Sequence, residues 1–229
     1  MCFTPLVSIS TAIIELILAF LLISFFRKSK LTPFFFAVLI LLGWYQFSEF
    51  MLCTTGNLFW IRFGFIGYTF LPAAGLHSIL NYFKIKVNLI LLYLVPTTYS
   101  LFALFNAHFA ISGQCILIFV QVKTLLTGQP LRVIPYILYY ALFIILAFAI
   151  LWKAYLKART KIQKQIDLSE MMGILLMTIP TFVLIIIFPA LGIMFPSVLC
   201  HFGLLLGICF FFAAYLDNKM NLHEKFHKK

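Results

Sequence analysis

LFWIRFGFIGYTFLPAAGLHSILNY, residues Leu58–Tyr82, is long and apolar enough to cross a bilayer, because about 20 residues at ~1.5 Å each span ~30 Å. Projected on a helix, its small residues share one face: Gly64, Gly67, Ala74, Gly75 and Ser78. Arg62 and Thr69 fall on the opposite face, and small residues and charges both seek neighbours inside a membrane bundle. A helix with neighbours on opposite sides is expected at the centre of a bundle.

The rest of the chain has the composition of an integral membrane protein. Of its 229 residues, 64% are hydrophobic and only 10% are charged, far from the usage of soluble domains. Seven apolar stretches are long enough to span a bilayer, at about 5–26, 33–53, 58–82, 87–105, 133–156, 168–194 and 197–216. We therefore expect an all-α seven-transmembrane helix bundle over residues 1–217, followed by a short basic tail at 218–229.

The distribution of basic residues predicts how this bundle is oriented. Fourteen of the 17 lysines and arginines fall in the first, third and fifth connections or after the last span. Only Arg62, Lys123 and Arg132 remain for the other side. The positive-inside rule then places the N-terminus outside and the C-terminus in the cytoplasm of a bacterial inner membrane. The net charge of +11 is thus a topology signal that suits a lipid bilayer as partner, and no nucleic-acid partner is expected.

Charged and polar residues inside the predicted spans are the first candidates for function. Glu15 lies deep in the first span, and Gln46 and Glu49 share a face of the second. Glu49 and Arg62 lie equally far from the tight turn between the second and third spans, each ~6 Å below the outer surface. We expect them to form an ion pair, either as a structural clasp or as the anchor of a polar ligand.

The second and third spans also carry a pattern that resembles a known family. Trp44 to Glu49 is followed by the segment W60-I-R62, by the pair I66-G67 and by Pro72. This order resembles the N-terminal seven-transmembrane region of bacterial histidine kinases. The resemblance implies a sensor module, and the span count and orientation agree with it. The chain departs from the family in having no acid at residues 193–196 and no kinase after the last span, so a separate effector is expected.

The longest expected outer loop, about residues 106–132, predicts an ordered lid. Cys115 to Val122 is rich in residues that favour strands, and residues 127–130 are typical of a turn. A strand or hairpin over the outer mouth of the bundle is expected. A disulfide between Cys53 and Cys115 is possible, although five cysteines leave at least one thiol over within the chain.

Tyrosines and a histidine complete the expected pocket. Tyr136, Tyr139 and Tyr140 share one face of the fifth span, where they form either an interfacial aromatic belt or, turned inward, part of a pocket. His201 lies near the outer end of the seventh span, at the depth of Glu49. The candidate ligand-binding wall is therefore Glu15, Gln46, Glu49, Arg62, Tyr136, Tyr139, Tyr140 and His201.

Several classes of protein are excluded by the residues. The seventh span contains no lysine for a retinal Schiff base, and the Asp-Arg-Tyr and Asn-Pro-x-x-Tyr signatures of eukaryotic receptors are absent. The five histidines are scattered in depth, which argues against a metal centre, and no phosphate-binding glycine loop or nucleophile elbow occurs. We expect no cofactor, no metal and no enzyme activity.

These observations favour a receptor-like module that binds a small, amphipathic or lipid-like ligand in an outward-facing pocket. Signalling would pass to a separate partner through residues 153–170 and the C-terminal tail. A small transporter is the alternative, because several spans contain proline and polar residues. Against a transporter, no internal repeat is visible and the polar residues become fewer toward the inside. An intramembrane lipid enzyme that uses Glu15, Glu49 or His201 is a third interpretation.

Overall fold

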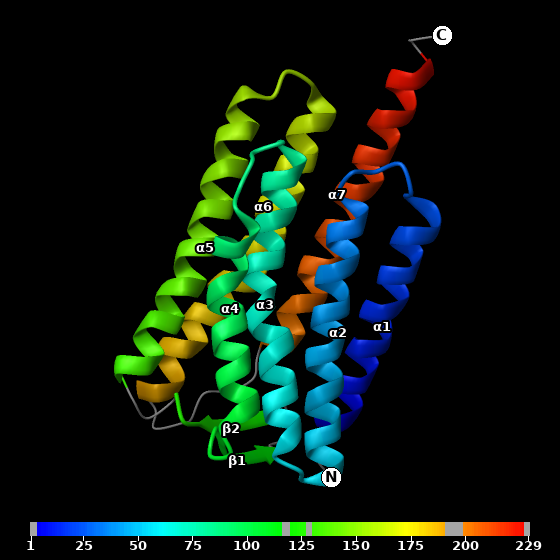
Figure 1. Ribbon diagram of the computed structural model, residues 1–229. Coiled ribbons are helices and arrows are strands. Elements are labelled where there is room, and N and C mark those ends of the chain that lie inside the picture. Colours follow the sequence, from blue (N-terminus) through cyan, green and yellow to red (C-terminus); the bar gives the residue numbers. More distant parts are fainter. Residues whose placement is uncertain (1–3, 116–119, 127–129, 191–198, 227–229) are drawn as a thin grey trace.

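The computed structural model describes residues 4–115, 120–126, 130–190 and 199–226. These residues form seven helices and one two-stranded hairpin (Figure 1): α1 Thr4–Phe25, α2 Thr32–Thr55, α3 Phe59–Tyr82, α4 Leu89–Phe105, β1 Ala110–Cys115, β2 Val120–Thr124, α5 Pro130–Lys157, α6 Lys161–Ala190 and α7 Leu199–Phe226. Five of the described helices, α1, α2, α3, α5 and α7, are long and apolar enough to cross a membrane. The chain is an α-helical multi-pass membrane protein.

The bundle has two distinct ends (Figure 1). The start of α1, the connection between α2 and α3, and the β1–β2 hairpin lie at one end, which we call the hairpin end. The connections α1–α2, α3–α4 and α5–α6 lie at the other end together with the C-terminal part of α7, and we call it the tail end. Helix α7 continues to Phe226, so most of the segment predicted as a tail extends the last helix.

Helix α3 lies between α2 on one side and α4 and α5 on the other, as its sequence predicts (Figure 1). Its glycines explain the close contact with α2. A Cβ added to Gly64 would lie 3.0 Å from the Cβ of Ser48, and one added to Gly67 would lie 3.2 Å from the carbonyl oxygen of Leu41. A Cβ added to Gly75 would meet nothing within 4 Å, because that part of α3 faces a cavity.

Tyrosines of α5 hold the opposite side of α3, next to Pro72. Proline has no N–H to bond the carbonyl four residues earlier, that of Tyr68, and the hydroxyl of Tyr140 donates to this carbonyl instead. The hydroxyl of Tyr139 donates to the carbonyl of Thr69 at 2.8 Å, and the hydroxyl of Tyr136 lies 2.9 Å from Oγ1 of Thr69. These tyrosines therefore turn inward, because α3 supplies the hydrogen-bond partners that lipid lacks.

The expected lid is present as an antiparallel hairpin over α2 and α3. Strands β1 and β2 pair from Ala110 and Thr124 at one end to Cys115 and Val120 at the other. A disulfide joins Cys53 near the end of α2 to Cys115, with the two Cα atoms 5.7 Å apart. At Gly113 the strand runs so close to the helices that an added Cβ would lie 3.0 Å from Cδ1 of Ile61 on α3. The hairpin is thus fixed to the bundle by packing and by a covalent bond.

The surface away from the cavity is apolar. On α4, Ile90 and Leu94 are exposed, and on α5 Leu138 and Ile145 are exposed. Side chains of this kind on the outside of a bundle suit contact with lipid tails, since water would make such a surface unfavourable.

Candidate functional site

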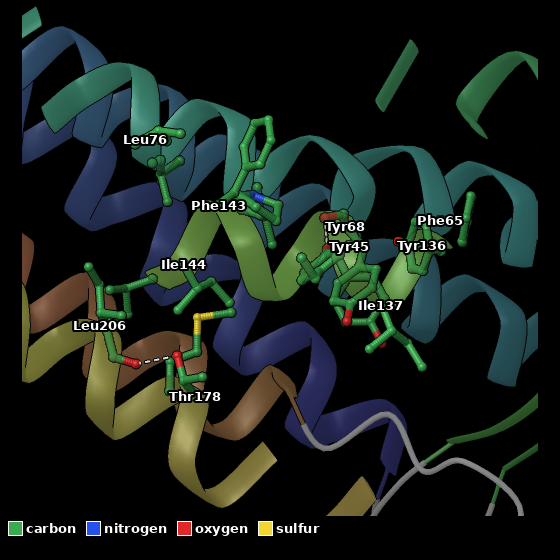
Figure 2. Close-up of a pocket in the computed structure, with 18 of the residues that line it drawn as sticks. Tyr45, Phe65, Tyr68, Leu76, Tyr136, Ile137, Phe143, Ile144, Thr178 and Leu206 are labelled. Carbon is green, nitrogen blue, oxygen red and sulfur yellow. Dashed lines mark hydrogen bonds between the residues drawn. The ribbon is translucent and has the colours of Figure 1, made fainter. Parts of the chain in front are cut away.

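A cavity of about 540 Å³ runs along α3 inside the bundle (Figure 2). It is lined by side chains of α2, α3, α5, α6 and α7 and by the hairpin strand β2. On α3 the lining residues extend from Trp60 to Ile79, a distance of ~28 Å along the helix. Its volume lies within the range of small-molecule sites, and most of its wall is aliphatic or aromatic.

Aromatic rings form the middle of the wall. Tyr68 of α3 stacks on Tyr140 of α5, with the ring centroids 4.8 Å apart, and on its other side lies 5.8 Å from the ring of Tyr45 on α2. Toward the hairpin end, Phe65 stacks on Tyr136 at 5.3 Å. Figure 2 shows these rings together in one part of the wall, with aliphatic side chains beyond them. Because the hydroxyls of Tyr136 and Tyr140 are occupied by contacts to α3, the rings present mainly apolar surface.

The hairpin end of the cavity is more polar. Ser48 and Glu49 of α2 line it, together with Lys123 and Thr124 of β2. Glu49 is buried, and its Oε2 accepts a hydrogen bond from the hydroxyl of Ser8 on α1 at 3.5 Å. A carboxylate and an ammonium at one mouth of an apolar cavity can orient an amphipathic molecule.

Arg62 contacts the segment that leads from α4 to the hairpin. Its guanidinium donates to the carbonyl oxygen of Ala107, in the segment that leads from α4 to the hairpin. Arg62 does not line the cavity, whereas Glu49 does, and no contact between the two is among those that the structure describes. The Glu49–Arg62 ion pair stays a prediction, since equal depth on two helices does not fix the direction in which each side chain turns.

Glu15 and Gln46 are fully buried but lie outside the cavity wall. Glu15 faces α7, where a Cβ added to Gly203 would lie 3.3 Å from Oε1 of Glu15. Among the described residues, neither oxygen of Glu15 and neither polar atom of the Gln46 amide has a hydrogen-bond partner. Glu15 is therefore part of the contact between α1 and α7, and Gln46 is buried inside the bundle.

Three members of the expected wall line the cavity in the structure: Glu49, Tyr136 and Tyr140. Tyr139 is buried against α3 without reaching the cavity. The side chain of His201 lies outside the described residues, so its place in the wall stays a prediction.

Sequence reasoning missed a group of acidic residues at the tail end. Asp167, Glu170 and Asp217 are all buried there, and Glu170 lines the cavity together with Ser78 of α3. The expectation that polar residues become fewer toward this end is therefore wrong. The spacing of Asp167 and Glu170, three residues apart on the basic segment 153–170, would have indicated a common helix face.

Hydrogen bonds connect several elements in this region. The amide of Gln163 donates to Oδ1 of Asp167 at 2.9 Å, and the hydroxyl of Tyr82 donates to Oε1 of Gln163 at 3.3 Å. The backbone N–H of Lys30, between α1 and α2, donates to Oδ2 of Asp217 at 2.8 Å. Asp167 precedes the apolar part of α6, and burial raises its pKa to about 6 although the hydrogen bond from Gln163 acts in the opposite direction.

The arrangement as a whole suits binding of an elongated molecule. Carboxyl groups lie near both ends of the cavity, at Glu49 and Glu170, and the wall between them is apolar. Within the described part of the chain, no group of three or more His, Cys, Asp or Glu side chains is arranged to hold a metal ion. No family model, curated protein or solved structure matches this chain.

Proposed function

We propose that the chain is a seven-transmembrane receptor-like module of a bacterial inner membrane that binds a small amphipathic or apolar molecule. The ligand occupies the cavity along α3, and the signal passes to a separate partner protein. The long apolar cavity, covered at one end by a disulfide-linked hairpin, is the observation that carries this proposal. The resemblance of Trp44–Pro72 to sensor regions of histidine kinases supports the same function.

The orientation in this proposal follows from charge. The connections at the tail end contain basic residues such as Arg27, Lys84 and Arg159, whereas the hairpin end has few. The tail end therefore faces the cytoplasm and the hairpin faces outward. A partner would dock where α5 ends at Lys157 and α6 begins at Lys161. These two helices line the cavity, and their ends lie on the cytoplasmic side in this orientation.

Helix α3 is the element through which occupancy of the cavity would be transmitted. Pro72 interrupts its hydrogen bonding, Tyr140 donates to the carbonyl of Tyr68 that the proline leaves free, and Tyr139 donates to the next carbonyl, that of Thr69. A ligand against Gly75 or Tyr68 would contact α3 and α5 together and favour one arrangement of the two helices.

Filling the cavity tests ligand binding. Gly75→Phe places a ring where an added Cβ has nothing within 4 Å, so we expect the variant to fold. In nonionic detergent, dodecanol should raise the melting temperature of the wild type and have little effect on Gly75→Phe. Ile145→Phe, on the exposed face of α5, is the matched control and should respond like the wild type. An equal response of all three proteins, or no response of the wild type, would contradict the proposal.

Signalling requires a second experiment. A photoreactive residue at Lys161 should crosslink a kinase or cyclase in cells, in an amount that changes when the ligand is added. Absence of any crosslinked partner would remove the signalling part and leave a binding protein.

A small transporter is the second candidate, and one observation favours it. The cavity reaches from Glu49 near the hairpin end to Glu170 near the tail end, which suits a pathway that opens to either side of the membrane in turn. Flux of a labelled amphiphile into vesicles containing the protein would decide for this function, and Gly75→Phe should then abolish the flux.

A further inference from the structure

Two buried polar side chains face the tail end of the cavity without a hydrogen-bond partner. Glu170 of α6 and Ser78 of α3 are each only 1% exposed, and both line the cavity. Among the described residues, nothing bonds Oε1 of Glu170 or Oγ of Ser78. An unsatisfied buried polar atom is unfavourable, so two of them on one cavity wall indicate a polar group that arrives with a ligand.

The surroundings determine the charge of that group. Asp167 and Asp217 are buried close enough to Glu170 to act on it electrostatically. Their hydrogen bonds come from neutral donors: the Gln163 amide to Asp167, and the backbone of Lys30 and the hydroxyl of Tyr82 to Asp217. In the part of the chain that the structure describes, no lysine or arginine side chain forms an ion pair with these three acids. Three buried carboxyls without a cation favour a positively charged partner.

The rest of the cavity indicates the chemistry of the part of the ligand beyond its head group. Between Leu76 and Phe65 the wall extends ~16 Å along α3 and is formed by apolar side chains and tyrosine rings. Figure 2 shows Leu76, Phe143 and Leu206 at one end of this wall, and Phe65 and Tyr136 at the other. A hydrocarbon chain fits this surface, with its head group at Glu170.

We propose that the cavity binds a long-chain primary amine, whose ammonium group is held by Glu170 and Ser78. A primary ammonium carries three N–H donors, enough to bond Oε1 of Glu170 and Oγ of Ser78 and to keep one for water or a further acceptor. This inference rests on the proposed function, since it specifies the class of ligand for the same cavity.

The test compares three probes that share one alkyl chain: dodecylamine, dodecanol and dodecyltrimethylammonium. Each is titrated into the wild-type protein in nanodiscs of zwitterionic lipid near pH 7.5, and binding is followed by the shift in melting temperature. We expect dodecylamine to bind at least about tenfold more tightly than dodecanol. Dodecyltrimethylammonium should bind less tightly than dodecylamine, because it has the charge but no N–H to donate.

Variants separate the head-group site from the rest of the cavity. Glu170→Gln should bring the affinity for dodecylamine down to that for dodecanol, while dodecanol binding shows that the cavity is intact. Ser78→Ala should weaken dodecylamine by a smaller factor. Glu15→Gln, a buried carboxyl outside the cavity, is the matched control and should keep the full preference.

The outcomes distinguish this inference from the function on which it rests. Equal binding of amine and alcohol, or an unchanged preference in Glu170→Gln, overturns the amine site and leaves an apolar binding cavity. Failure of all three probes to bind the wild type overturns both. If Glu15→Gln loses the preference for dodecylamine over dodecanol as fully as Glu170→Gln does, the site is also overturned. The preference would then come from the net charge of the protein and not from Glu170.

Discussion

The bundle contains two buried groups of polar side chains, one toward each end, and they differ in how they are satisfied. The hairpin-end group is Ser8, Glu15, Gln46 and Glu49, and the tail-end group is the buried acids Asp167, Glu170 and Asp217 with the half-buried Tyr82 and Gln163. In the first group, Glu15 and Gln46 have no hydrogen-bond partner among the described residues. In the second group, side chains of α3, α6 and α7 and the α1–α2 link are joined by hydrogen bonds.

This difference separates structural polar groups from those available for binding. Hydrogen bonds between elements fix how helices pack against each other. Removing one partner of such a bond leaves the other partner buried and unsatisfied, which is unfavourable. Two oxygens of the tail-end group also lack a partner among the described residues, Oδ2 of Asp167 and Oε1 of Glu170, but only Glu170 lines the cavity. Burial alone therefore does not mark a site, and the combination of burial, a free acceptor and an adjacent cavity does.

The largest expected effect concerns how the hairpin end is held. Replacing both Cys53 and Cys115 by serine removes the disulfide that closes a segment of 62 residues, and we expect a loss of about 3 kcal/mol in the free energy of unfolding. Titration with SDS in mixed micelles, followed by circular dichroism, measures it. Cys209→Ser, at a free and half-buried cysteine, is the control and should change little. A double variant as stable as the wild type would show that packing alone holds the hairpin.

The tail end is expected to depend on Asp217. Asp217→Ala removes the acceptor for the backbone N–H of Lys30 and for the hydroxyl of Tyr82, and should destabilise the protein by about 2 kcal/mol. Asp217→Asn keeps one carbonyl oxygen and should lose less. The same SDS titration measures both variants, and equal stability of Asp217→Ala and the wild type would mean that this end is held by apolar packing.

The sequence predicted the hairpin-end group better for a physical reason. A carboxyl such as Glu15, surrounded by apolar residues in the chain, is recognised as buried because no other position is open to it. The position of α3 and the lid also follow local patterns of small residues and strand formers, and the common face of the three tyrosines follows helix spacing, although that spacing left their direction open. Those patterns are properties of one segment at a time.

The tail-end group could not be predicted because its burial depends on tertiary contacts. Asp167 lies among lysines near a helix start, where charged side chains are usually solvated. It is buried because α6 packs closely on α7, with the hydroxyl of Ser169 donating to the carbonyl of Cys209 at 2.8 Å. The direction of Arg62, toward Ala107, likewise depends on how α3 is rotated against its neighbours, which spacing along the chain does not contain.

A smaller effect of opposite sign is expected at Glu15. Both its oxygens lack a partner among the described residues, so Glu15→Leu replaces an unsatisfied polar group by an apolar one of similar size. We expect a gain of about 1 kcal/mol in unfolding free energy, and a smaller gain for Glu15→Gln. A loss of stability in Glu15→Leu would show that the carboxyl is bonded to water or to a cation, and the hairpin-end group would then be as well satisfied as the tail-end group.

The smallest expected effect is the pH dependence that Asp167 contributes. Its pKa is about 6 in the folded protein, where burial disfavours the charged form, and close to the ordinary value of 3.8 when the chain is unfolded. Between these two pH values the unfolded state releases the proton and the folded state keeps it. Stability should therefore fall as the pH rises from about 4 to 6, by up to about 1 kcal/mol once screening is considered, and stay level above and below this range.

Asp167→Asn isolates this contribution, because the amide does not titrate. The difference in unfolding free energy between wild type and variant, measured at pH 4, 5, 6 and 7, should change between pH 4 and 6 and then become constant. Glu15→Gln gives the corresponding curve for the hairpin-end group. Parallel curves for the wild type and Asp167→Asn would mean that the carboxyl keeps its ordinary pKa, and hence that water reaches the tail-end group through the connection between α5 and α6.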